Sequence, residues 1–178
     1  MLVIAIFFFM KQIALISDSH GKLDTLALKH VKDVDEIWHA GDLGGIEVLD
    51  QLEKIATVRA VYGNIDDHTV RNATQEMATF EVEGLKVVMT HIGGYPGRYY
   101  KGIGPYLTKT KPNLFISGHS HILKVMRDAS KNLLHINPGA IGKHGFHKVR
   151  TLIKFDIDKA EIQNVRVVEL GPRGKLSI

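Results

Sequence analysis

Hydrophobic runs of strand length alternate with segments of helical spacing in the first half of the chain. Apolar runs typical of buried strands cover residues 12–17, 36–41 and 57–63. Between them, residues 22–32 and 46–55 carry apolar side chains three and four positions apart, which is the spacing of one helix face. This order predicts parallel strands, because a helical crossover joins strands that run in the same direction.

The second half of the chain has the pattern of antiparallel strands. Residues 80–91 are typical of a hairpin, and a glycine-rich loop (93–104) and a short helix (105–110) lead to an apolar run from Leu114. Strand-like segments then follow one another with no helical spacing between them: residues 124–128, 133–137, 150–157 and 161–170. The pattern therefore predicts one α/β domain with a β-rich second half.

Composition narrows the chemistry that is available to the chain. It contains no cysteine, which excludes disulfides and thiolate metal sites, so a metal ion would need histidine, carboxylate or amide ligands. The net charge of +4 comes from scattered lysine and arginine side chains and indicates no dedicated nucleic-acid surface. A chain without cysteine suits the reducing cytoplasm, where we expect this protein, without membrane contact.

The first nine residues, MLVIAIFFF, are an apolar extension of uncertain status. They reach about half the length that a membrane-spanning helix needs, and they lack the basic start and cleavage site of a signal peptide. Because Met10 opens a natural chain start, we expect the domain to span residues 10–178. Residues 1–9 are then a misassigned start or a cloning remnant, with an extra strand or a partner contact as the alternatives.

Histidine and oxygen-bearing side chains follow the apolar runs at five separate strand ends. Layered α/β folds assemble their sites at the carboxyl ends of strands, so these side chains are expected to meet. They are too many for one tetrahedral zinc ion and suit two metal ions, with Asp42 as the bridge. The candidate ligands are Asp18, His20, Asp42, Asn64, His91, His119 and His121.

In their order, these blocks resemble the calcineurin-like metallophosphoesterases, and among them the small single-domain phosphodiesterases. The blocks that carry the resemblance are Asp18-x-His20, Gly41-Asp42, Gly63-Asn64-x-Asp66, His91 and Gly118-His119-x-His121, followed by NPGA at 137–140. The resemblance implies a four-layer sandwich of two mixed β-sheets flanked by helices. It also implies one metal ion on Asp18, His20 and His121, a second on Asn64, His91 and His119, and Asp42 shared by both.

The implied function is two-metal-dependent hydrolysis of a small phosphodiester. Two divalent ions activate a hydroxide near neutral pH, and this hydroxide attacks phosphorus in line with the leaving oxygen. No catalytic residue beyond the metal ligands is then required. Manganese is the expected ion, and iron, zinc, nickel and cobalt also suit such ligands.

One departure from the wider family affects the leaving group. Many relatives have a histidine in the third block that is thought to protonate the leaving oxygen, whereas this chain has Ile65. The compact phosphodiesterases also lack that histidine, which favours esters with good leaving groups. His68 is the nearest substitute, although a surface histidine is the simpler interpretation. Asp66 and Asp67 either orient the groups around the ligands or simply cap the following turn.

Other polar residues are candidates for contact with the substrate or for support of the ligands. His39 closely precedes Asp42, and a partly buried strand histidine is the alternative interpretation. Arg98 lies in the glycine-rich loop, which is tethered to the fourth ligand block and is expected to lie near the ions. His144 and His147 belong to a basic turn that either contacts substrate or is simply exposed.

A protein-binding scaffold is the rival function. The retromer scaffold subunit resembles this architecture but has lost part of the ligand set, whereas every ligand position here holds a metal-competent side chain. The complete set favours hydrolysis. Apolar strands in the second half leave room for a homo-oligomer.

Overall fold

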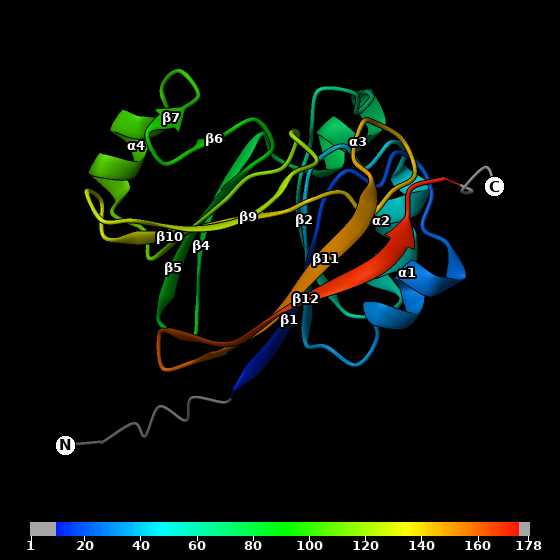
Figure 1. Ribbon diagram of the computed structural model, residues 1–178, viewed down its shortest axis with the longest axis horizontal. Coiled ribbons are helices and arrows are strands. Elements are labelled where there is room, and N and C mark those ends of the chain that lie inside the picture. The colour runs from blue at the N-terminus through cyan, green and yellow to red at the C-terminus, as the bar shows by residue number, and fades with distance from the viewer. Residues whose placement is uncertain (1–9, 175–178) are drawn as a thin grey trace.

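A computed structural model describes residues 10–174 as two mixed β-sheets packed face to face (Figure 1). In the first sheet the strand order is β12-β11-β1-β2-β3, and β1, β2 and the edge strand β3 are parallel to one another, as the sequence pattern predicts. Its strands are β1 (Lys11–Ile16), β2 (Glu36–Ala40), β3 (Thr57–Val61), β11 (Val149–Asp158) and β12 (Glu161–Pro172).

The second sheet also contains three adjacent parallel strands, and its strands come from the middle of the chain. Its order is β4-β5-β8-β10-β9, and β5, β8 and β10 are parallel, with an antiparallel strand at each edge. These strands are β4 (Met77–Val82), β5 (Leu85–Thr90), β8 (Leu114–Ile116), β9 (Leu123–Asp128) and β10 (Leu133–Pro138). In both sheets three parallel strands lie side by side, so their carboxyl ends can build one site between the sheets.

Helices complete the four layers that the family resemblance implies. Apolar side chains of α1 (Thr25–His30), α2 (Ile46–Glu53) and α3 (His68–Ala73) pack on the outer face of the first sheet. On the opposite side, α4 (Ile103–Thr110) packs on the outer face of the second sheet (Figure 1). The amphipathic spacing of these helices thus buries one face each against a sheet.

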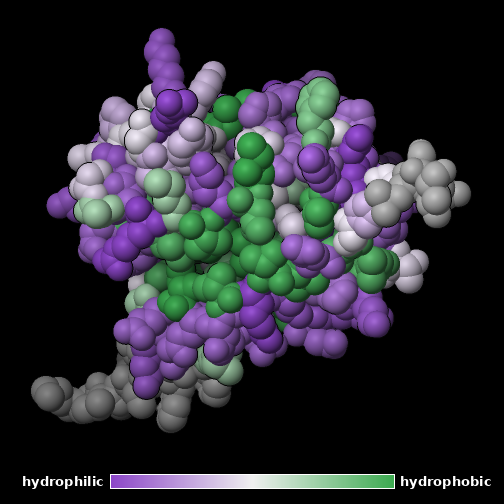
Figure 2. Space-filling model, viewed as in Figure 1, coloured by the Kyte–Doolittle hydropathy of each residue, from purple (hydrophilic) through white to green (hydrophobic). Residues whose placement is uncertain are grey.

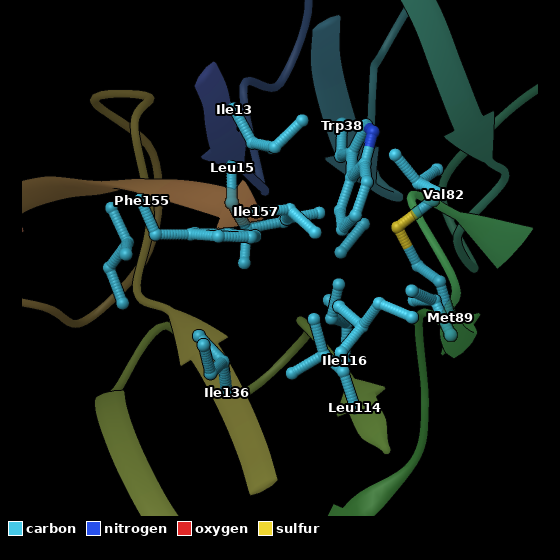
Figure 3. Close-up of a cluster of buried hydrophobic side chains, with 14 of the residues drawn as sticks. Ile13, Leu15, Trp38, Val82, Met89, Leu114, Ile116, Ile136, Phe155 and Ile157 are labelled. Atoms are coloured by element: carbon cyan, nitrogen blue, oxygen red, sulfur yellow. The ribbon is translucent and has the colours of Figure 1, made fainter. Parts of the chain in front are cut away.

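The core between the sheets is built from the inward-facing side chains of both. Figure 3 shows Trp38 and Phe155 of the first sheet facing Ile116, Ile136 and Met89 of the second. The rings of Trp38 and Phe155 lie edge to face, with centroids 5.6 Å apart. The Trp38 ring also lies edge to face with Phe80 of β4, with centroids 5.0 Å apart, and this contact joins the two sheets in a geometry that aromatic pairs prefer.

Two elements lie where the hydrophobic pattern indicated only loops. α3 occupies part of the stretch between β3 and β4, and its N-cap is Asp67, whose side chain accepts hydrogen bonds from two backbone N–H groups. The glycine-rich loop contains a small hairpin of β6 (Gly94–Tyr95) and β7 (Arg98–Tyr99). Both are too short to show a period. Of the two roles left open for Asp67, the structure shows the cap.

Exposed apolar side chains lie on the edge strands, Val125 and Met126 on β9 and Val165 and Val167 on β12. Figure 2 shows hydrophobic residues across the middle of the face on which Figure 1 places β9, β11 and β12. A homo-oligomer through this face stays a prediction. Within residues 10–174, no helix is long and apolar enough to cross a bilayer. The predictions for residues 1–9 lie outside the described residues.

Candidate metal centre

The candidate ligands come together at one edge of both sheets. Those after β1, β2 and β3 meet those after β5 and β8 between the two sheets. Within residues 10–174 they form two groups, in each of which the ligand atoms lie within 4.8 Å of one another: Asp18, His20 and His121, and Asp42, His91 and His119. Asn64, after β3, lines the same cavity as His91.

Asp42 lies between the two groups. In the first group, Nε2 of His121 is 3.1 Å from Oδ1 of Asp18 and 3.3 Å from Nε2 of His20. In the second group, Nε2 of His91 is 3.2 Å from Oδ1 of Asp42. The other carboxylate oxygen of Asp42 is 4.0 Å from Nε2 of His20 in the first group. One carboxylate therefore faces both groups.

The backbone at the ligands adopts a conformation that non-glycine residues rarely use. A left-handed conformation costs an L-residue roughly 1 kcal/mol or more, and such residues gather at functional sites. Five ligands have positive φ angles between 51° and 65°: Asp18, His20, Asp42, His119 and His121. The chain thus bends sharply at each of them and directs their side chains toward one point.

At the glycines of the ligand blocks there is no room for a side chain. A Cβ atom on Gly63 would collide with Oδ1 and the backbone nitrogen of Asp42, and one on Gly41 would come within 2.6 Å of the His91 ring. A Cβ atom on Gly118 would collide with the Ser17 hydroxyl. Only glycine allows these loops to approach the ligands so closely.

The surroundings of the Asp18 carboxylate indicate whether the site suits a metal ion. Its side chain is 0% exposed, and within residues 10–174 neither carboxylate oxygen has a hydrogen-bond partner. Nε2 of His121 is close to Oδ1 but does not make a hydrogen bond to it. A buried carboxylate without a partner is costly, whereas carboxylate and imidazole ligands suit a divalent ion. The donor set therefore fits divalent metal binding.

The pKa directions favour the metal-binding form of His20, His119 and Asp42, and the protonated form of His91. Burial lowers the pKa of His20 and of His119, although nearby carboxylates act in the opposite direction, so both rings tend to be neutral. Burial acts to raise the pKa of Asp42, but the adjacent His91 outweighs it and keeps that pKa low. The pKa of His91 is raised, because Asp42 and Asp18 outweigh the effect of burial. Neutral imidazole and ionised carboxylate are the forms that bind metal.

Buried groups behind the ligands hold the strand ends in place. Nδ1 of His91 is 2.8 Å from the carbonyl oxygen of Ala40, which aims Nε2 at the carboxylates. Asp66 accepts hydrogen bonds from the N–H groups of Leu43, Gly44 and Gly63, and so ties the loops after β2 and β3 together. Such supporting contacts orient metal ligands.

His39 lies behind the first ligand group. It is 0% exposed, and its Nε2 is 2.9 Å from the hydroxyl of Ser19, between Asp18 and His20. Burial lowers the pKa of His39 to about 4, although the Asp18 and Asp66 carboxylates act against it. A fully buried ring supports the ligands and does not reach substrate.

The other polar candidates lie at different distances from the ligands. His68 begins α3 and is exposed, and Arg98 is exposed on β7, in the wall of a cavity that includes His119. The ring of His144 lies 5.0 Å from that of His20, and Nδ1 of His147 is 3.2 Å from Nδ1 of His121. The basic turn therefore lies against the first group.

Arg71 is a supporting residue that the sequence pattern did not indicate. Its guanidinium donates hydrogen bonds to the carbonyl oxygens of Gly63, Asn64 and Asp66 and lies over the Tyr62 ring. It holds the third ligand block from α3. No sequence motif places an arginine there, because the contact depends on where α3 packs.

Two cavities adjoin the ligands. One, of about 450 Å³, is lined by Asn64 and His91 together with Arg71 and Lys101. The other, of about 430 Å³, includes His119 and Arg98. Ile92 and Tyr100 line both cavities, so the two meet beside the ligands. Each offers a cationic side chain and aromatic walls to a bound molecule.

Comparison with known proteins gives a consistent result. The model of the calcineurin-like phosphoesterase superfamily domain matches residues 10–160. A probable metallophosphoesterase of Methanothermobacter thermautotrophicus is 31% identical over 133 residues, which cover 72% of this chain and 76% of that protein.

Solved structures share the fold at lower identity. A novel archaeal phosphodiesterase superposes with a TM-score of 0.69 at 22% identity, over 89% of this chain and 99% of its own. Vps29 of Entamoeba histolytica, complexed with zinc, superposes with a TM-score of 0.70 at 18% identity, over 89% of this chain and 98% of its own. At these identities the likeness concerns the fold alone.

Proposed function

The chain belongs to the calcineurin-like phosphoesterase superfamily, and from this premise we propose that it is a two-metal phosphodiesterase. The observation that carries the proposal is the meeting of the two ligand groups around Asp42, with unpartnered oxygens on the buried Asp18. In this proposal one ion is held by Asp18, His20 and His121 and the other by Asn64, His91 and His119, with Asp42 shared. When bound, the two ions supply a hydroxide for in-line attack and offset the charge of the phosphate.

The protein contributes a site whose charges are set in advance. The carboxylates of Asp18 and Asp42 are held in the interior beside the imidazoles, an arrangement that suits divalent cations. Arg71 and Lys101 in one cavity and Arg98 in the other are placed to attract an anionic ester. The proposed roles are therefore metal binding for the interior groups and substrate orientation for the cavity walls.

Two features support a diester over a monoester. A diester carries two substituents on phosphorus, and the two cavities that meet at Tyr100 can receive one each. The side chain of Ile65, in the position of the usual leaving-group acid, is apolar and 46% exposed. Esters whose leaving oxygen needs no acid suit such a site.

A protein-binding scaffold is the second candidate, because several solved neighbours are Vps29 structures. One of them contains zinc, so metal binding alone does not separate an enzyme from a scaffold on this fold. Catalytic turnover does separate them.

The test is hydrolysis of a chromogenic phosphodiester and its matching monoester by chelator-stripped protein, with and without manganese. We expect manganese-dependent cleavage of the diester by the wild type. In the Asp42→Asn variant this activity should fall by at least about 100-fold, because removing a residue that only supports a ligand already costs up to about that much. Asp50→Asn, the same chemical change at an exposed position of α2, is the matched control. Folded protein that cleaves neither ester with any divalent metal would favour the scaffold.

A further inference from the structure

The turn after β10 contributes a histidine that touches a candidate ligand. Nδ1 of His147 is 3.2 Å from Nδ1 of His121, and Nε2 of His147 is 3.1 Å from the carbonyl oxygen of Gly142. On its other edge, the His121 ring presents Nε2 to Oδ1 of Asp18 at 3.1 Å. The Gly142 carbonyl and the imidazoles of His147 and His121 thus form one hydrogen-bonded row, and the Asp18 carboxylate is not part of it, because neither of its oxygens has a hydrogen-bond partner within residues 10–174.

The order of donors and acceptors in this row follows from the carbonyl at its end. A carbonyl oxygen can only accept, so Nε2 of His147 must carry a proton, and a neutral His147 then has a lone pair on Nδ1. Two N–H groups cannot face each other, so Nδ1 of His121 is the donor. Nε2 of His121 is left with the lone pair that a metal ion requires.

We propose that His147 is a positioning residue, which selects the His121 tautomer with a lone pair on Nε2 and thereby sets the affinity of the first group for its ion. The inference rests on the proposed metal centre, because the lone pair matters only if an ion binds there. It assigns to the basic turn a role in metal binding instead of substrate contact.

The second group shows the same arrangement in a shorter form. Nδ1 of His91 is 2.8 Å from the Ala40 carbonyl oxygen, so a backbone carbonyl fixes that tautomer directly. His121 lies in the segment after β8, and His147 provides the connection to a carbonyl instead. Gly145 permits this contact, because a Cβ atom at that position would collide with Nδ1 of His121.

The direct test determines the tautomer without any metal. Long-range ¹H–¹⁵N correlation spectra of chelator-stripped protein, at a pH above the ordinary histidine pKa of about 6.5, report which ring nitrogens carry protons. His121→Gln identifies the His121 signals. We expect the proton on Nδ1 of His121 in the wild type and a loss of this preference in His147→Ala. A proton on Nε2 of His121 in the wild type would overturn the inference.

Metal affinity is the second test, measured by equilibrium dialysis of manganese against the stripped protein. His147→Ala should weaken one of two ions by about 10- to 100-fold, the usual effect of removing a group that orients a ligand. His147→Asn should restore most of the affinity, since its Oδ1 takes the place of the accepting Nδ1. Lys148→Ala, an exposed neighbour in the same turn, should bind both ions as the wild type does.

The two tests separate failure of the inference from failure of the proposed function. If the wild type binds two ions and His147→Ala binds both equally well, the inference is wrong and the phosphodiesterase proposal stands. If the wild type binds no divalent ion, the proposed function fails and the affinity role fails with it. The tautomer of His121 is then still decided by the spectra.

Discussion

The two halves of the candidate metal centre are supported by different parts of the fold. The half with Asp42 and His91 is anchored to the sheets through His91, whose side chain is 2% exposed and touches the carbonyl at the end of β2, although His119 in the same half is exposed. In the half with Asp18, the side chains of His20 and His121 are 12% and 13% exposed. His121 is connected to a carbonyl only through His147, in a turn.

This difference shows how two similar ligand groups can differ in robustness. Strand ends are placed by the hydrogen-bonded sheet, whereas a turn is placed by fewer contacts and opens more readily. We therefore expect substitutions in the turn to affect one ion and substitutions at the shared Asp42 to affect both.

The largest effect should come from Gly63→Ala, which acts on the residue common to both halves. The new methyl group would collide with Oδ1 and the backbone nitrogen of Asp42, so we expect Asp42 to shift. Turnover of a diester should fall by at least about 100-fold, and the free energy of unfolding by about 1–3 kcal/mol, as for other overpacked interiors. Steady-state kinetics and urea titration measure the two quantities.

Gly174→Ala is the matched control, because a Cβ atom there meets nothing within 4 Å and the backbone needs no positive φ. Loss of only one of the two bound ions in Gly63→Ala would contradict the placement of Asp42 between the halves. A group other than Asp42 would then have to be shared by the two ions.

An intermediate effect concerns acid stability and His39, behind the first half. The pKa of His39 is about 4 when folded because of burial, below the unfolded value of about 6.5. The unfolded chain therefore binds the extra proton, so stability is lost as the pH falls from about 6.5 toward 4, by at most about 3 kcal/mol. His39→Gln should flatten this part of the profile in urea titrations of metal-free protein.

His135 provides the matched case in the second sheet. It is buried on β10 beside the Ser117 hydroxyl, as His39 is beside Ser19, and burial also lowers its pKa to about 4. His135→Gln should flatten the profile by a similar amount, and the double variant by the sum. An acid profile that neither change alters would show that other groups control the loss of stability.

The sequence predicted most of the fold because the fold follows periodicity. The apolar runs at 12–17, 36–41 and 57–63 became β1, β2 and β3, and they are parallel as their helical crossovers require. α3 was not predicted, since six residues with a single buried position, Val70, show no helical period. The hairpin of β6 and β7 is shorter still.

The candidate ligands could be proposed from the sequence because each follows an apolar run, and strand ends are where such folds place sites. The residues that support these ligands could not be proposed from the sequence. Arg71 reaches the Asn64 carbonyl, and His147 reaches the His121 ring, only because helix and turn pack where they do. The left-handed backbone at Asp18 and His119 has only a weak sequence signature, because aspartate and histidine are enriched at positive φ but adopt it in a minority of cases.

The smallest effect should come from Arg71→Ala, which tests the half that the sheets support. Loss of its hydrogen bonds to the Gly63, Asn64 and Asp66 carbonyls should loosen the third block and weaken one ion by about 10-fold, the low end for supporting groups. Equilibrium dialysis of manganese measures it. His68→Ala, an exposed change on the same helix, should bind both ions as the wild type does.

Combining Arg71→Ala with His147→Ala decides whether the halves are independent. If each change weakens a different ion, the double variant should show both losses in full, because distant changes without shared contacts add. Losses that fail to add would mean that the Asn64 block and the His121 ring are coupled through Asp42, which faces both groups. In that case the turn and the sheets support one centre jointly, and the difference in exposure between His91 and His121 would not predict which ion is lost first.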